Sequence, residues 1–166
     1  QIPLWCGYVG AVVLAGMKGR GVAADFGLSF RAVDPSWIVV GVAVQVVVLP
    51  LLYWPILRLV GRTSEDLSAP ARSLADKAQS SWGWVVLALI VVVGAPVVEE
   101  LFFRGLLLRS LQKGGMSDLW SCVVCAAVFA AIHLQVLQFA GLFVIGLVLS
   151  ALAVRTGAVN LGQGFP

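Results

Sequence analysis

The sequence contains few charged residues. Lys, Arg, Asp and Glu make up 11% of the 166 residues, whereas a typical soluble domain has about 25%. Hydrophobic residues make up 60%, and the mean hydropathy is +1.00. So few charged residues cannot cover the surface of a soluble protein. The composition therefore indicates an integral membrane protein, and we expect the lipid bilayer to be one of its partners. The net charge of +3 comes from scattered basic residues, and we expect no nucleic-acid binding.

Cysteine and histidine are also scarce, with three cysteines and one histidine, His133. Cys122 and Cys125 form a C-x-x-C inside an apolar run, where they share one helix face. Without a second C-x-x-C they do not complete a zinc site. We interpret them as small buried hydrophobic residues, and the chain has no disulfide framework.

Five apolar segments predict an all-α, polytopic transmembrane helical bundle. The second has 21 uncharged residues, enough to cross a hydrocarbon core of about 30 Å, and its Pro50 and Pro55 predict a kink in its second half. Residues 66–79 can form a short surface helix. We expect residues 1–166 to be a single membrane domain, a fragment of a longer chain with further helices. The predicted membrane helices are 2–17, 37–57, 82–98 (continuing through 99–111), 119–137 and 139–154. The very short connection between the last two predicts that they form a tight antiparallel hairpin.

The distribution of basic residues predicts the orientation. The loops 18–36 and 104–118, together with the C-terminal tail, hold seven of the 11 Lys and Arg residues. Because basic loops stay in the cytoplasm, we expect both loops to be cytoplasmic. Low charge and many small aliphatic residues favour a bacterial inner membrane.

Three ionisable residues stand inside or next to the third apolar segment: Glu99, Glu100 and Arg104. Each costs roughly 2.5–3.5 kcal/mol at membrane depth and therefore marks a functional site. Glu100 and Arg104 are spaced i, i+4, which is the favoured geometry of an ion pair. Glu99 is rotated by about 100° from Glu100. One carboxylate can thus be structural, while Glu99 is free to act as a general base near neutral pH.

Two further features place a histidine near this site. Pro96 lets the glutamate helix bend, which favours a small wet cavity. On the next helix, Phe129 and His133 share a face, so Glu99 and His133 can face each other. A neutral imidazole can ligate a metal, hold a water or stabilise an oxyanion. The alternatives are a solvated helix-end carboxylate for Glu99 and a packed interhelical histidine for His133.

These motifs resemble those of a known family. The run EELFFR at residues 99–104 resembles the E-E-x-x-x-R motif of the CPBP intramembrane proteases, relatives of the CAAX prenyl-protein endoprotease and of bacteriocin-processing (Abi) proteins. FAAIH at 129–133 resembles their F-x-x-x-H motif. Residues 146–150 and the RTG at 155–157 look like the segment before their third motif. The resemblance covers residues 82–160.

The resemblance implies a glutamate-activated water that hydrolyses a peptide bond of a membrane-associated peptide or protein. Glu99 would be the base, and His133 would hold the water or stabilise the oxyanion. Glu100 and Arg104 would support them, with Phe129 and Pro96 in supporting positions. A divalent metal such as zinc would be held by Glu99 and His133.

One departure from the family leaves a second function open. The family's third motif, H-x-x-x-N, supplies a second histidine, but this chain has one, and Asn160 does not match the spacing. Either the helix with this motif lies beyond Pro166, or this member has lost it, and Glu99, Glu100 and His133 alone do not predict a three-ligand zinc site. The alternative is an inactive family member that serves as an accessory or scaffold subunit of a membrane complex. A transporter is the least favoured function, because the chain has no repeats.

The chain has small or uncharged polar residues at which helices can pack closely. They are Gly41 and Gln45 on the second predicted helix, and Gly146 and Ser150 on the fifth. Close packing at these positions suits a protease and a scaffold subunit equally.

Overall fold

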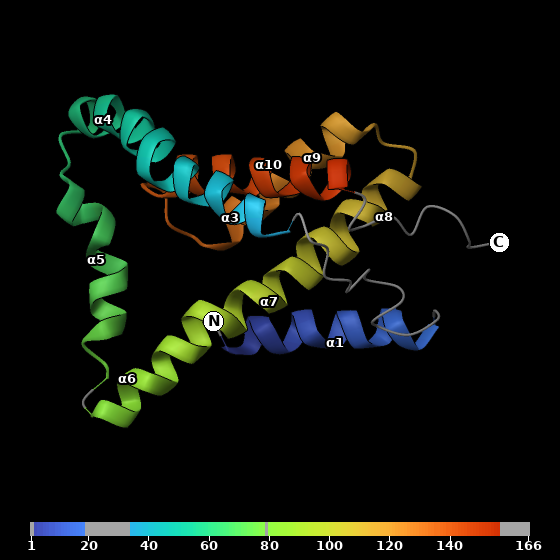
Figure 1. Cartoon of the computed structure of the whole chain (residues 1–166), viewed down its shortest axis with the longest axis horizontal. Helices are drawn as coiled ribbons and strands as arrows, with labels where there is room; N and C mark the ends of the chain where they lie inside the picture. Colours follow the sequence, from blue (N-terminus) through green and yellow to red (C-terminus); the bar gives the residue numbers. More distant parts are fainter. Residues whose placement is uncertain (1, 19–33, 79, 157–166) are drawn as a thin grey trace.

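The structure, a computed structural model, describes residues 2–18, 34–78 and 80–156, and these form six continuous helices (Figure 1). The predicted all-α fold is confirmed for these residues. Two of the six helices contain π-helical stretches, labelled η. The segments are α1 (Ile2–Lys18); α3 (Asp34–Ala43), η1 (Val44–Val48) and α4 (Leu49–Val60); α5 (Ser64–Ala75); α6 (Ser81–Ala88), η2 (Leu89–Gly94), α7 (Ala95–Glu100), η3 (Leu101–Leu107) and α8 (Leu108–Lys113); α9 (Asp118–Ile132); and α10 (Phe139–Thr156).

Two helices are long and apolar enough to cross a membrane. They are Val39–Val60, with 22 residues and a mean hydropathy of 2.1, and Ser81–Lys113, with 33 residues and 2.4. The longer one extends about 50 Å at 1.5 Å per residue, well beyond a hydrocarbon core of about 30 Å. Large apolar side chains along both helices are exposed, among them Leu51, Trp54, Leu89 and Val92. Lipid would cover this surface. The other three apolar helices are shorter: Cys6–Met17, Asp118–Ile132 and Phe139–Arg155.

The π-helical stretches hold wider turns, in which an N–H bonds to the carbonyl five residues back. Leu49 N–H donates to Val44 O, and Ala95 N–H donates to Ile90 O. Each of these turns ends one residue before a proline, because a proline ring crowds the carbonyl four residues earlier and the helix widens there. The disturbance predicted at Pro50 and Pro96 therefore lies before each proline, within a continuous helix.

The third wide turn, η3, differs from the other two because no proline follows it. Leu108 N–H donates to Phe103 O at its end. Its buried residues are Phe103, Arg104 and Gly105. Wide turns inside α-helices occur frequently at functional sites, and this one directly follows the two glutamates.

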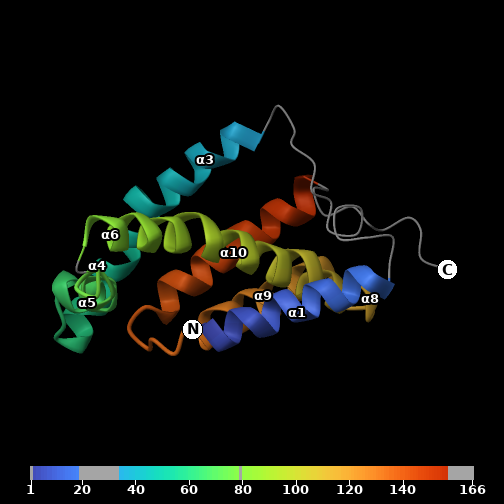
Figure 2. The same ribbon diagram turned by 90° about the horizontal axis from the view of Figure 1, so that it is seen from below.

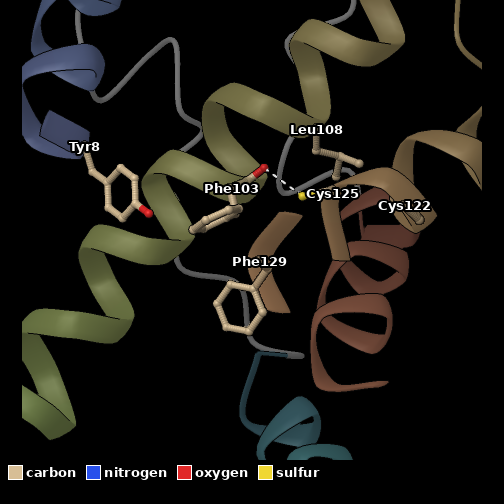
Figure 3. Close-up of a cluster of buried hydrophobic side chains, with 6 residues drawn as sticks. All are labelled: Tyr8, Phe103, Leu108, Cys122, Cys125 and Phe129. Atoms are coloured by element: carbon tan, nitrogen blue, oxygen red, sulfur yellow. Dashed lines mark hydrogen bonds between the residues drawn. The ribbon is translucent and has the colours of Figure 1, made fainter. Parts of the chain in front are cut away.

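The shorter helices pack around η3. α1 contacts α7 and η3, α9 contacts η3 and α8, and α10 lies along α9. Figures 1 and 2 show the long helix α6–α8 crossing between α1 and the α9–α10 pair. The core lies where these helices meet (Figure 3). It consists of Tyr8, Phe103, Leu108, Cys122, Cys125 and Phe129.

The helix α9 ends at Ile132, so its predicted extension to residue 137 is wrong. His133 N–H bonds to Ala130 O, which tightens the last turn, and Leu134 then adopts the left-handed region at φ 53°. A left-handed residue stops a helix. The following turn brings α10 back along α9, so the predicted hairpin of these two helices is confirmed.

The turn between α9 and α10 is tied to two other segments. Tyr53 Oη donates to Gln138 O at 2.9 Å and accepts from Gly141 N–H at 2.9 Å. Gln138 Nε2 donates to Leu67 O on α5 at 2.7 Å. The α5 helix is the predicted surface helix, shifted to Ser64–Ala75 because a capping box of Thr63 and Asp66 sets its start.

Candidate active site

Arg104 joins three of the helices. Its side chain is 3% exposed, and Nη1 lies 3.2 Å from Glu100 Oε1, which confirms the predicted ion pair. Nη2 donates to Gly146 O on α10 at 3.4 Å. The guanidinium also lies over the Phe129 ring of α9, with Cζ 4.9 Å from the centroid, at cation–π distance. Arg104 therefore holds both sequence motifs and α10 in one arrangement.

Glu99 and Glu100 take different positions, as their rotation on the helix predicts. Glu100 is paired with Arg104 and its side chain is 47% exposed. Glu99 is half-buried and has no ion pair among the described residues. It is close enough to His133 and Arg104 to interact with both electrostatically. That Glu99 and His133 face each other stays a prediction, as do the catalytic roles of both.

His133 is held in one orientation by its own helix. Its Nδ1 lies 2.7 Å from Phe129 O, and its ring meets the Phe129 ring edge-on at 4.8 Å. A carbonyl oxygen can only accept a hydrogen bond, so Nδ1 carries the proton. In the neutral imidazole, Nε2 is then the acceptor. The same carbonyl contact thus fixes the ring and its tautomer.

Small residues let α9 and α10 approach closely behind this site. A Cβ on Gly146 would lie 3.1 Å from Ala126 Cα and 3.2 Å from the Phe129 ring. Ser150 is fully buried and interacts with Cys125, whose Sγ donates to Phe103 O at 3.3 Å. The predicted packing role of Gly146 and Ser150 is confirmed, and so is the burial of Cys122 and Cys125.

The helix face at Gly41 and Gln45, which was also predicted to pack closely, does not do so. Both residues line a groove of about 470 Å³ between α3–η1 and α10, with Ile145 and Leu149 on the opposite side. A Cβ on Gly41 would meet nothing within 4 Å. Within the described chain this face is therefore not closely packed. None of the predicted site residues lines this groove. Pro96 is exposed, and the small wet cavity expected near it stays a prediction.

The described residues do not form a three-ligand metal centre. Zinc sites take three or four His, Cys, Asp or Glu ligands, and no three such side chains converge among the residues described. Glu99 and His133 could supply two ligands. The predicted divalent metal stays a prediction. Gly157 and Asn160, which bear on the third motif, lie outside the described residues.

Two contacts at the site carry no sequence signal. Tyr8 comes from α1, more than 90 residues before the glutamates, and packs on Phe102 and Phe103. The carbonyl of Gly146 accepts from Arg104, a role that any residue type could fill. Tyr8 is one aromatic residue among many in apolar segments, and only the packing of α1 on η3 makes it part of the site.

Comparison with known proteins finds a family that matches the region with these motifs. Residues 81–162 match a family described as "Type II CAAX prenyl endopeptidase Rce1-like". Over 138 residues the chain is 30% identical to an Escherichia coli protein named "Uncharacterized 24.3 kDa protein", covering 79% of this chain and 58% of that relative. The chain thus spans less than two thirds of this relative's length. No solved structure matches the chain significantly.

Proposed function

We propose, because residues 81–162 belong to the Rce1-like family of type II CAAX prenyl endopeptidases, that the protein is a membrane-embedded endopeptidase. Its substrate would be a membrane-associated peptide or protein. The observation that carries this proposal is the chain of contacts from the glutamate helix to His133: Arg104 pairs with Glu100 and lies over Phe129, whose carbonyl holds the imidazole. Glu99 itself has no ion pair among the described residues. A carboxylate left unpaired beside an oriented imidazole is suited to activating water.

The chemistry follows from the two side chains. The neutral His133 Nε2 accepts a hydrogen bond from a water and so orients it, while Glu99 takes the proton of that water as general base. The water oxygen attacks the peptide carbonyl carbon. The protonated Glu99 then returns the proton to the leaving amine as the C–N bond breaks. Arg104 reaches neither reacting atom in this scheme and acts by holding η3, α9 and α10 together.

The position along the helix favours a site near one membrane face. Glu99 lies about 27 Å from Ser81 along the helix, at 1.5 Å per residue. If the span begins at Ser81, Glu99 is close to the opposite edge of a hydrocarbon core of about 30 Å. The predicted loop 104–118 is wrong at its start, because this helix continues to Lys113. Its basic residues Arg104, Arg109 and Lys113 still follow Glu99, so this face would be cytoplasmic by the positive-inside rule. The relative from Escherichia coli supports a bacterial inner membrane.

A second candidate function is a non-catalytic subunit of a membrane complex. The observation that favours it is the close packing of η3, α9 and α10 around Arg104 and Gly146, which a purely structural role would also use. In this case Glu99 would have no catalytic role. The two functions are separated by what Glu99 does, because only hydrolysis requires its proton transfer.

The test is peptide cleavage by the purified protein in proteoliposomes. The probes are quenched fluorogenic peptides that end in a CAAX sequence, with and without a prenyl group. We expect wild-type protein to cleave at least one of them and Glu99→Gln to abolish cleavage. The matched control is Glu65→Gln on α5, far along the chain and exposed, which should cleave as wild type does. Equal cleavage by Glu99→Gln would remove Glu99 as the base.

A further inference from the structure

The hydroxyl of Tyr8 on α1 is buried without a partner. The residue is 7% exposed, and its Oη has no hydrogen bond among the described residues. Leaving a buried hydroxyl without a hydrogen bond costs folding free energy, and such groups therefore require an explanation. The other tyrosine, Tyr53, has two hydrogen bonds through its hydroxyl. The Tyr8 hydroxyl lacks such protein partners and is free to bind a water or a substrate atom.

The ring of Tyr8 is fixed on the face of the helix that carries Glu99. It stacks on Phe102 at 4.2 Å between centroids and meets Phe103 edge-on at 5.7 Å. Phe102 and Phe103 follow Glu99 by three and four residues, in the first turn of η3. Figure 3 shows the Tyr8 side chain extending from α1 toward this helix beside Phe103. The packing of α1 on α7 and η3 holds the ring there.

Tyr8 and Glu99 are near each other but not in direct hydrogen bond. The stacking on Phe102 and Phe103 places the Tyr8 ring beside the segment that directly follows Glu99, and Tyr8 Oη has no hydrogen-bond partner among the described residues. A single water fits this relationship, because it would accept from the hydroxyl and donate to the carboxylate. The same carboxylate interacts with His133 and Arg104, and Glu100 is its neighbour in the chain. A water in this position would join the Tyr8 hydroxyl to the carboxylate that the proposed hydrolysis pairs with His133.

We propose that Tyr8 is a catalytic residue whose hydroxyl donates a hydrogen bond to the water that Glu99 activates. This proposal rests on the proposed hydrolytic function. The water accepts from Tyr8 and donates to Glu99 and to His133 Nε2, which leaves one lone pair for the carbonyl carbon. Glu99 removes one proton, the oxygen–carbon bond forms, and the carbonyl π electrons move to its oxygen. Collapse breaks the C–N bond and returns the proton to the amine. Tyr8 keeps its own proton throughout.

The test compares the two tyrosines of the chain in the full protein. Tyr8→Phe keeps the stacking on Phe102 and removes only an unpaired hydroxyl, so the melting temperature should stay the same or rise. In cleavage of the CAAX peptide, kcat should fall roughly 10²-fold because the attacking water is no longer held in position, with KM unchanged. The matched control, Tyr53→Phe, loses two hydrogen bonds and should lower the melting temperature while kcat changes little.

A second readout does not depend on activity. The infrared carboxylate band of Glu99 is identified as the band that Glu99→Gln removes, and Tyr8→Phe should shift it because the bridging water loses a donor. An unchanged band together with an unchanged kcat would overturn the role of Tyr8, as would a lowered melting temperature with an unchanged band. If wild-type protein cleaves no peptide, the proposed function fails, whereas the band still decides whether Tyr8 reaches Glu99 through water.

Discussion

The guanidinium of Arg104 lies over the ring of Phe129, with 4.9 Å between Cζ and the ring centroid. The two residues belong to different motifs on different helices, and Phe129 in turn holds His133 through its carbonyl and its ring. Arg104 also forms the ion pair with Glu100, so it connects that glutamate to the Phe129 ring. The position of the histidine relative to the two glutamates therefore depends on this contact.

Replacing Arg104 with lysine should destabilise the protein although the charge is kept. A lysine cannot pair with Glu100, bond to Gly146 O and stack on Phe129 at the same time. We expect a loss of roughly 1–3 kcal/mol, measured by thermal unfolding in detergent. The control is Arg62→Lys, at the exposed ion pair with Asp66 (3.6 Å), which should change stability by less than about 0.5 kcal/mol. Equal effects of the two substitutions would contradict the joining role of Arg104.

A methyl group at Gly146 should separate α9 from α10. Its Cβ would come within 3.1–3.2 Å of Ala126 and Phe129, and such overpacking costs typically about 1–3 kcal/mol. Gly146→Ala should therefore lower the melting temperature and, by moving Phe129, lower cleavage as well. Gly10→Ala is the matched control, since a Cβ there meets nothing within 4 Å. It should stabilise α1 by about 0.5–1 kcal/mol. A Gly146→Ala protein as stable as wild type would argue against close packing at this point.

A glycine at Leu134 should stabilise the protein. Leu134 has φ 53° and is 89% exposed, so the substitution removes backbone strain and little packing. We expect a gain of about 1 kcal/mol, seen as a higher melting temperature. Leu134→Ala keeps a Cβ and should show no such gain. A stability gain with alanine equal to that with glycine would indicate that the left-handed backbone is not the cause.

The start of α5 should depend on pH. The backbone N–H of Thr63, followed by its hydroxyl and by Arg62, holds the pKa of Asp66 below its ordinary value of 3.8. Because the pKa is lower in the folded state, this stabilisation is present above pH 3.8 and is lost as the pH falls through the folded value. Amide hydrogen exchange in the first turn of α5 should accelerate in that range. In Asp66→Asn, which removes the titrating carboxylate, the exchange should be faster already at neutral pH and should respond less to acid. Identical profiles in both proteins would exclude the capping box.

The sequence predicted what depends on local periodicity. The ion pair of Glu100 and Arg104 and the shared face of Phe129 and His133 follow from i, i+4 spacing on a helix. The five apolar segments and the hairpin of α9 and α10 follow from hydrophobic run lengths and short connections. These features need no knowledge of how distant helices pack.

The sequence did not predict what depends on packing and on backbone conformation. The end of α9 at Ile132 depends on a left-handed Leu134, a conformation that leucine rarely adopts. The wide turn at η3 contains no proline or other local signal. The contact of Tyr8 with the glutamate helix results from the packing of α1, which brings together residues far apart in the chain.

The most direct test of the account compares the two adjacent glutamates in one protein preparation. Glu99→Gln and Glu100→Gln are measured for peptide cleavage and for melting temperature. The account predicts that Glu99→Gln abolishes cleavage and leaves the melting temperature unchanged, because Glu99 does chemistry and holds no ion pair among the described residues. It predicts that Glu100→Gln lowers stability by roughly 1–3 kcal/mol, because the buried Arg104 loses its counter-charge. Full cleavage by a stable Glu99→Gln protein would contradict the central claim that Glu99 activates the water.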